Sequence, residues 1–276
     1  MKRYFYLFLL VCGFVESSPY LSFDDGLILK KIDDLEIRCN FIIVDESSYP
    51  ISIYAVNHKI NLYKKISNDQ TCIDGLYSLQ DYLYDRFNKP ILKIGFQSKV
   101  NDLFFQEKDS RFYQQENSFI EYSKTGSIYS VNVKLRETSN EILFDESYIS
   151  ILIGKNALSL GRKSLWWSPS DISSLILSNS ARPSMGIELK NYHPINFNKS
   201  FLSAISNIEY TFFLNKLEKE RHVPNAFLFG NRVSFNIGDF TRLSLMRVAQ
   251  YGGDGRPKDI DTFLKLLAGI DNADEN

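Results

Sequence analysis

Apolar positions in the first part of the chain recur at the spacing of an α-helix. One stripe runs from Ile28 to Cys39 and another from Leu76 to Phe87, both with a period of three to four residues. The Tyr49-Pro50 pair breaks the chain between them, and a third stripe at residues 56–63 fits a further short helix. Such spacing places apolar side chains on one helix face. The pattern predicts a small helical region whose stripes face a core.

From Lys89 onward the period changes from helical to two. Apolar and polar residues alternate at residues 129–136, 208–214 and 232–237. Alternating side chains point to opposite faces of a strand. Strands of about ten residues with this alternation are typical of outer-membrane barrels, and the same alternation describes one face of a soluble antiparallel sheet. Further predicted strands lie at 91–98, 118–123, 148–154, 185–192 and 241–249.

The polar face of these predicted strands is charged. In a soluble sandwich the opposite, aromatic and aliphatic face needs a second sheet to cover it. In a membrane barrel that face meets lipid, and the charged face lines the lumen. The pattern alone leaves both architectures open. The charged positions are Lys134, Arg136, Glu209, Arg232 and Arg242.

The N-terminus has the order of regions found in a secretory signal. Met1-Lys2-Arg3 carries two positive charges, and an apolar run follows from residue 4 to residue 15. The run is shorter than the roughly 20 residues that a membrane-spanning helix needs. We expect cleavage near Ser17 or Ser18, so that residues 1–18 are a signal peptide. The alternative is a lipoprotein with Cys12 as the lipidated residue, but Val11 precedes it where a small residue is expected.

Composition and charge narrow the function classes. The formal net charge is −1, and the chain has no basic stripe with interleaved aromatic residues, so we expect no nucleic-acid partner. Aromatic residues make up 14% of the chain, which suits sheets and membrane interfaces but also ordinary secreted β proteins. Cys39 and Cys72 would lie in an oxidising compartment after export. The sequence leaves open whether they form a disulfide or stay as two thiols.

The most distinctive stretch contains both tryptophans of the chain, Trp166 and Trp167, followed by Ser-Pro-Ser. A loop that presents these rings could stack on the C–H faces of sugars, while Asn179 and Arg182 reach hydroxyls and carboxylates. The alternative, which the residues alone favour, is that the tryptophans form a membrane-interface girdle or pack under the loop.

A second stretch, residues 251–257 (Tyr-Gly-Gly-Asp-Gly-Arg-Pro), is glycine-rich. Three glycines in four positions let the backbone turn tightly and approach a partner. No Lys-Ser/Thr pair follows, so it is not a phosphate-binding loop. We interpret it as a long outer loop that presents Asp254 and Arg256, followed by a helical face that begins near Ile260.

Catalytic patterns are poor. The three histidines have no metal-ligand spacing, and no nucleophile elbow is present. Carboxylates are plentiful, but none of them is singled out as an acid/base pair. We therefore expect no enzyme, no cofactor and no metal. The alternative function is a secreted β-sheet enzyme that processes glycans, with Asp145 and Asp254 as the carboxylates to test.

At residues 166–183 the chain resembles the Wzi capsule-assembly family, whose pattern there is Trp-Trp-Gly-Pro-Gly … Ser-Leu-Ile-Leu-Ser-Asn-Asn-Ala-Arg-Pro. Similar blocks occur at 221–226 with 232–235, and at 252–257 with 263–272. Three residues depart from the pattern, which alters the turn and removes one amide. They are Ser168 and Ser170 in place of glycines and Ser180 in place of an asparagine.

The resemblance implies an 18-stranded outer-membrane barrel with a helical bundle at its periplasmic mouth. It also implies a lectin role, in which the protein binds exported capsular polysaccharide without catalysis. The chain has candidates for only about nine strands of about ten residues each. We therefore expect a C-terminally truncated form, with a short form that oligomerises to close the barrel as the alternative.

The sequence thus predicts a mainly β fold: a partial antiparallel transmembrane β-barrel of the outer-membrane type, with a small N-terminal helical region. We expect the signal peptide at 1–18, a helical periplasmic region at 19–88 and the partial barrel with outer loops at 89–276. The expected partners are capsular or other surface polysaccharide and outer-membrane lipid, and the oligomeric state stays open. The residues expected to bind carbohydrate are Trp166, Trp167, Asn179, Arg182, Asp254 and Arg256.

Overall fold

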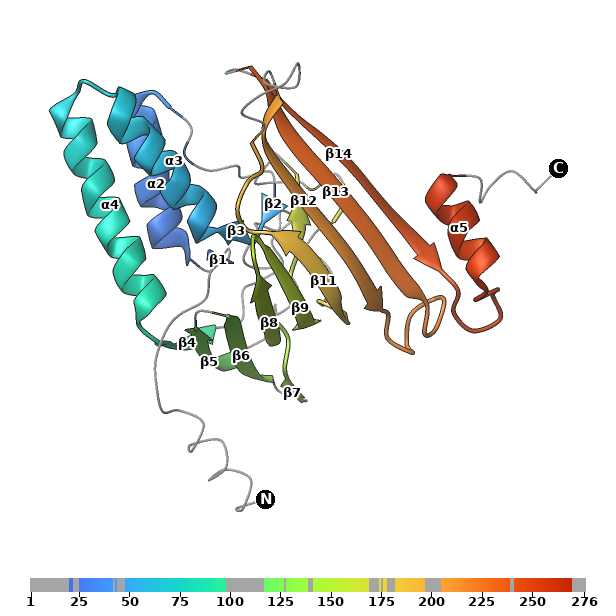
Figure 1. Cartoon of the computed structure of the whole chain (residues 1–276). Coiled ribbons are helices and arrows are strands. Elements are labelled where there is room, and N and C mark those ends of the chain that lie inside the picture. Colours follow the sequence, from blue (N-terminus) through green and yellow to red (C-terminus); the bar gives the residue numbers. More distant parts are fainter. Residues whose placement is uncertain are drawn as a thin grey trace.

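The computed structural model shows an N-terminal group of helices followed by one large, curved antiparallel sheet (Figure 1). No helix of the part described is long and apolar enough to cross a membrane. The structure describes residues 20–21, 25–41, 43, 48–97, 117–126, 128–138, 141–168, 174, 176–177, 182–196, 205–238 and 241–269.

Three helices form the N-terminal group: α2 (Gly26–Cys39), α3 (Ile53–Ile66) and α4 (Gln70–Asn88). The predicted stripes supply most of their common core, because the stripe residues Ile28, Ile32, Leu35, Val56, Ile60, Leu76, Leu79 and Leu83 are buried in one cluster, and Cys39 and Tyr63 are partly buried against it. Two polar side chains fix where helices begin. Ser52 Oγ accepts a hydrogen bond from the Ala55 amide at 3.3 Å and Asp69 from the Thr71 amide at 2.9 Å, which satisfies amides that the helix leaves unpaired.

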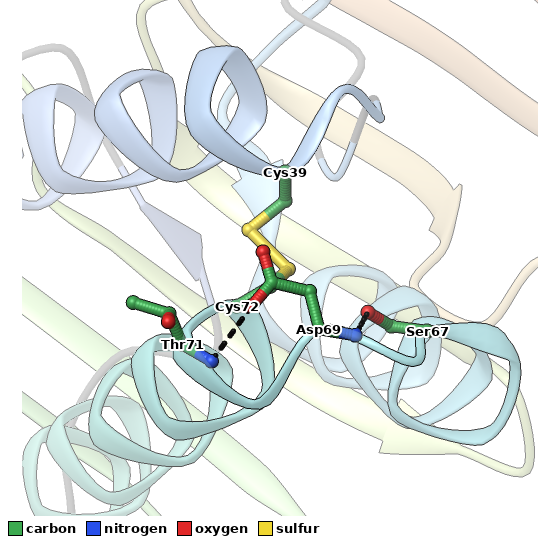
Figure 2. Close-up of a disulfide and its surroundings, with 5 residues drawn as sticks. All are labelled: Cys39, Ser67, Asp69, Thr71 and Cys72. Atoms are coloured by element: carbon green, nitrogen blue, oxygen red, sulfur yellow. Dashed lines mark hydrogen bonds between the residues drawn. A yellow bond between two sulfur atoms is a disulfide. The ribbon is translucent and has the colours of Figure 1, made fainter.

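A disulfide joins two of these helices (Figure 2). Cys39 is the last residue of α2 and Cys72 lies in the first turn of α4, with their Cα atoms 5.6 Å apart. Figure 2 shows the bond beside the start of α4, where the Asp69 amide also donates to Ser67 Oγ at 3.3 Å. The cysteines whose pairing the sequence left open are therefore linked.

Ten strands of the described residues form the large sheet, in the order β14-β13-β12-β11-β9-β8-β6-β5-β4, with β7 paired to β6. All paired neighbours run antiparallel. The strands are β4 (Ile91–Gln97), β5 (Asn117–Thr125), β6 (Tyr129–Thr138), β7 (Ile142–Leu143), β8 (Tyr148–Ile153), β9 (Asn156–Arg162), β11 (Met185–Asn191), β12 (Ile205–Lys216), β13 (Phe227–Ile237) and β14 (Thr241–Tyr251).

The two faces of the sheet have the chemistry that the alternation predicts. Lys134 and Arg232 point to the concave face and are each 1% exposed. Ile151 and Leu245 point outward and are 51% and 60% exposed. Inward charges meet partners, as in the 2.9 Å bond from Arg242 to Glu209, because an unpaired charge is costly to bury. The outward face is therefore an apolar surface, and the concave face is a charged and hydrogen-bonded one.

Four short strands fill the space between the helices and the sheet. β1 (Tyr20–Leu21) pairs with β3 (Ile51–Ser52), and β2 (Ser48–Tyr49) pairs with β10 (Trp166–Trp167). Figure 1 shows β1, β2 and β3 between the helical group and the large sheet. The N-terminal part of the chain therefore occupies the concave side of the sheet.

The two ends of the sheet differ. One end, the turn end, carries the short connection between β8, which ends at Ile153, and β9, which begins at Asn156. The helices contact this end, where Tyr54 of α3 lies 5.1 Å from the Tyr192 ring and Lys93 of β4 bonds Asp25 at 2.9 Å. The opposite end, the loop end, carries several long connections, among them those between β6 and β8, between β9 and β11 and between β12 and β13, together with the segment after β14.

Candidate functional site

A cavity of about 260 Å³ lies on the concave side at the loop end. One part of its lining consists of cationic and amide side chains, Lys163, Arg182, Asn215 and Arg221. The other part is apolar and comes from four leucines and Phe213. The lining residues belong to strands and loops between residues 163 and 228, so the sheet brings two of the long connections to one place.

Arg182 links the connection between β9 and β11 to the connection between β6 and β8. Its guanidinium makes two bonds to Asp145, at 2.8 and 3.2 Å, and a third to Glu141 at 3.3 Å. The Asp145 side chain is only 2% exposed. Paired bonds between a guanidinium and a carboxylate fix both direction and distance. The loop after β9 is thereby fastened to the connection between β6 and β8.

The chain of charges continues to the third loop through Arg162. Its Nη1 atom lies 3.8 Å from Asp145 and 3.5 Å from Glu218, and it donates to the Pro183 carbonyl at 2.9 Å. Arg221 Nε then donates to Glu218 Oε2 at 3.0 Å. The ionic chain, Glu141–Arg182–Asp145–Arg162–Glu218–Arg221, therefore joins three connections of the loop end, two of which line the cavity.

The electrostatic surroundings of Glu218 reflect this chain. Partial burial alone would raise the pKa of the Glu218 carboxyl. Hydrogen bonds from its own backbone amide and from Arg221, together with the charges of Arg221 and Arg162, outweigh burial and hold this pKa below its usual value. Glu218 is therefore held in its ionised form beside two guanidinium groups.

Lys163, which lines the cavity, also belongs to a second, deeper ion pair. Lys163 Nζ bonds Glu188 of β11, and both side chains are at most 7% exposed. The ammonium also lies 4.5 Å from the centre of the Tyr20 ring and 5.0 Å from that of Tyr148. Burial, followed by the charge of Glu188, raises the pKa of the Tyr20 hydroxyl well above its usual value. The N-terminal strand β1 is therefore held beneath the cavity by cations of the sheet.

The two tryptophans are buried, so the expectation of a loop that presents their rings is not what the structure shows. Trp166 is 2% and Trp167 0% exposed. Strand β10 pairs with β2, and the Trp167 ring lies 5.5 Å from the Phe213 ring. Trp166 packs into the core of the helical group. The alternative reading, in which the rings pack under the loop, describes both residues, because the inserted β10 strand carries them into the concave side.

Asp254 and Arg256 lie on the loop after β14. Asn225 Nδ2 donates to Asp254 Oδ2 at 3.0 Å, and the Asp254 amide donates to the Pro224 carbonyl at 2.9 Å. Gly253, with φ of 109°, packs so close to the 221–226 loop that a Cβ would meet Val223 at 2.6 Å. This contact requires glycine. The structure therefore joins the 221–226 and 252–257 blocks into one unit.

Of the six predicted site residues, Arg182 lines the cavity, and Asp254 and Arg256 are exposed on the neighbouring loop unit. That unit also includes Arg221, which lines the cavity. The two tryptophans lie beneath, and Asn179 lies outside the described residues. Sequence reasoning did not name Arg162, Glu218 and Arg221 as site residues. Arg221 opens the 221–226 block that resembles the family, whereas Arg162 and Glu218 have no local motif and are brought together only by the pairing of the strands.

In the part of the chain that the structure describes, no group of three or more His, Cys, Asp or Glu side chains could hold a metal ion. The two carboxylates named for a glycan-processing enzyme have cationic or amide partners: Asp145 contacts Arg162 and Arg182, and Asp254 contacts Asn225 and Lys258.

Comparison with known proteins gives one family and two relatives. The model of the family described as capsule assembly protein Wzi matches residues 85–276. An uncharacterized 55.8 kDa protein in the cps region of Klebsiella pneumoniae is 26% identical over 126 residues, which are 46% of this chain and 25% of that protein.

The solved structure of Wzi from Escherichia coli, an outer-membrane protein involved in group 1 capsule assembly and described as a carbohydrate-binding β-barrel, is also similar. It aligns with a TM-score of 0.69 at 17% identity, over 91% of this chain and 56% of that one. The predicted fold class, a partial antiparallel barrel with an N-terminal helical region, is thereby confirmed. Together with the family match over residues 85–276, this shows that the chain belongs to the Wzi capsule-assembly family.

Proposed function

We propose that this protein binds exported capsular polysaccharide at the cell outer membrane and acts in capsule assembly without catalysis. The observation that carries the proposal is the cavity at the loop end, with guanidinium groups on one side and leucines with Phe213 on the other. Sugars present both kinds of surface, because hydroxyls and carboxylates accept from arginine while C–H faces pack on apolar side chains. The Escherichia coli relative, described as a carbohydrate-binding barrel, supports the same role.

The outward face of the sheet supports a place in the membrane. Its exposed side chains are aliphatic and aromatic, as in Leu245 and Phe96, and such a surface is stable in hydrocarbon. In this proposal residues 1–18 direct export, the helical region at 19–88 faces the periplasm, and residues 89–276 form the partial barrel. The loop end and its cavity then face the outside of the cell, where the polysaccharide arrives.

The proposal assigns different roles to the six residues named from the sequence. Arg182 binds at the cavity wall, and Asp254 and Arg256, with Asn179, extend the surface along the loops. Trp166 and Trp167 support that surface from below, because their rings are buried in the core. Arg221 joins the binding residues, since it lines the cavity and its side chain is 40% exposed.

Equilibrium binding of purified capsular polysaccharide to the protein in lipid vesicles tests this function. The Arg221→Ala variant should bind about tenfold more weakly, because one charge-assisted hydrogen bond contributes roughly 1.5–3 kcal/mol and about 1.4 kcal/mol is tenfold in affinity. Arg38→Ala, which changes an exposed arginine on α2, is the matched control and should bind normally.

Two results would contradict the proposal. One is equal affinity of the parent, Arg221→Ala and Arg256→Ala, which would place binding elsewhere. The other is the release of new reducing ends from the polysaccharide by the parent protein and their absence with Asp145→Asn, which would favour the glycan-processing enzyme instead.

A further inference from the structure

The helix α5 (Ile260–Ala268) lies on the opposite side of the sheet from the cavity. Its Phe263 ring contacts Phe229 of β13 edge-on, with ring centres 5.8 Å apart, and Tyr251 of β14 at 5.3 Å. Both partners belong to the outward face, since Gly230 and Arg232, the next inward positions of β13, are buried. Figure 1 shows α5 beside the loop end of β14. The helix therefore packs on the apolar outside of the sheet.

The ends of α5 are well defined for so short a helix. The Asp259 carboxylate accepts from the Thr262 amide and the Thr262 hydroxyl, each at 2.9 Å. These two bonds lower the pKa of Asp259. Gly269 ends the helix with φ of 77°, a left-handed conformation that favours glycine. The Tyr251 hydroxyl donates to the Asp259 carbonyl at 2.7 Å, which fastens the start of α5 to the strand.

Arg247 of β14 is a cation on the outward face, and α5 supplies a hydrogen-bond acceptor for it. It pairs with Asn231 in register and points to the outward face, where an unpartnered cation would be costly in lipid. Its Nη1 donates to the Leu267 carbonyl in the last turn of α5, at 3.2 Å. Helix C-termini carry partial negative charge, so this contact stabilises the guanidinium. The pair belongs at the depth of the lipid headgroups rather than in the hydrocarbon centre.

The remaining surface of α5 is apolar. Ile260, Leu264 and Leu267 are 77%, 55% and 43% exposed and stand at the i, i+4 and i+7 positions of one helix face. They continue the outward apolar surface of the sheet, to which Leu243 and Leu245 of β14 contribute. Lys258, an exposed cation two residues before the start of α5, suits anionic headgroups.

We propose that α5 is an interfacial helix that lies in the outer-leaflet surface of the membrane. Ile260, Leu264 and Leu267 contact acyl chains, while Lys258 contacts the anionic headgroups of the same lipids. The inference rests on the proposed function, because it requires the outward face of the sheet to meet lipid. It adds that the loop after β14 is held by the membrane, which fixes the position of Asp254 and Arg256 next to the cavity.

Quenching of tryptophan fluorescence by lipids brominated on their acyl chains tests the placement. Three variants of the full chain are compared in vesicles of brominated phosphatidylcholine and phosphatidylglycerol. Leu264→Trp reports on α5, Leu245→Trp reports on the outward face of β14, and Leu27→Trp, at an 81% exposed position of α2, reports on a site away from lipid. The emission of the parent protein, from Trp166 and Trp167, is subtracted.

We expect the tryptophan of Leu264→Trp to lose the same fraction of its emission as that of Leu245→Trp, and that of Leu27→Trp to lose none. Quenching of Leu245→Trp without quenching of Leu264→Trp would overturn the interfacial helix and leave the membrane sheet intact. In that case another protein segment or a second copy covers the helix. Absence of quenching in both would overturn the inference together with the membrane placement of the proposed function.

Discussion

At the scale of single residues, the arginines at the loop end connect loops as well as line the cavity. Arg182 and Arg162 reach the same carboxylate, Asp145, from two sides of one connection. Removing one member of such a pair destabilises the protein, because the remaining charge stays buried without its partner. The positions of the binding groups therefore depend on partners that do not touch the ligand.

Substitutions of Trp167 distinguish a role in supporting the fold from a role in binding polysaccharide. Trp167→Ala should lower the free energy of unfolding by about 3–5 kcal/mol, because it removes a fully buried ring. Trp167→Phe should keep most of this stability and bind polysaccharide like the parent. Urea unfolding of the protein in vesicles measures the free energy of unfolding, and a titration with polysaccharide measures the affinity. Tyr84→Ala, at an exposed ring of α4, is the control. A stable Trp167→Phe variant that no longer binds polysaccharide would indicate instead that the sugar stacks directly on the Trp167 ring.

The lowered pKa of Glu218 predicts how the stability of residues 217–226 changes with pH. Its pKa in the folded protein lies below its usual value of 4.5, so its ionised form is stabilised by folding. This contribution is present above the usual pKa and is lost as the pH falls through the lower folded value. Amide hydrogen exchange in residues 217–226 should accelerate in that window in the parent, once corrected for intrinsic rates. Glu218→Gln should show no such step, and an identical step in both proteins would contradict the assignment.

Only part of the site could be predicted from the residues. Arg182, Asp254 and Arg256 stand out in distinctive local stretches, and the structure places them on the loops at one end. Packing of Trp167 under the loop is part of the alternative that the residues favour, but its pairing with β2 could not be predicted, because β2 lies more than a hundred residues earlier in the chain. Arg162 and Glu218 carry no local motif, and only the pairing of strands brings their charges together.

At the scale of elements, alternation was a sufficient signal for most long strands. Eight of the predicted segments correspond to β4, β5, β6, β8, β11, β12, β13 and β14. Strand β9 was missed because its inward residues are small, namely Ala157, Ser159 and Gly161, so its polar face contrasts weakly with the apolar one. The short strands β1, β2, β3 and β10 could not be predicted, since two residues are too few to show a period.

The disulfide between α2 and α4 should contribute measurably to the helical region. Replacing both Cys39 and Cys72 by serine should lower its unfolding free energy by about 3–4 kcal/mol, the chain-entropy value for a loop of this length. Thermal unfolding followed by helical circular dichroism measures the change. Reductant should lower the melting temperature of the parent and leave that of the double variant unchanged. Equal sensitivity of both proteins would show that the disulfide does not carry the effect.

At the scale of the whole molecule, three surfaces have separate chemistries. The turn end meets the helical group, the outward face is apolar, and the loop end carries the cavity and the ionic chain. The proposed function uses this division, with the helical group in the periplasm, the outward face in lipid and the loop end outside the cell. The chain spans 56% of the solved Escherichia coli relative and aligns with 25% of the Klebsiella pneumoniae one. The role of the full-length relatives is therefore a proposal for this chain.

The central claim is that this protein holds capsular polysaccharide on the cell surface. The most direct test measures cell-bound and released polysaccharide in a strain that lacks the gene, with and without the chain supplied from a plasmid, after its presence in the outer-membrane fraction has been checked. We predict that the chain raises the cell-bound fraction and that Arg221→Ala raises it less. A chain that reaches the outer membrane and leaves the cell-bound fraction at the level of the deletion strain would contradict the account.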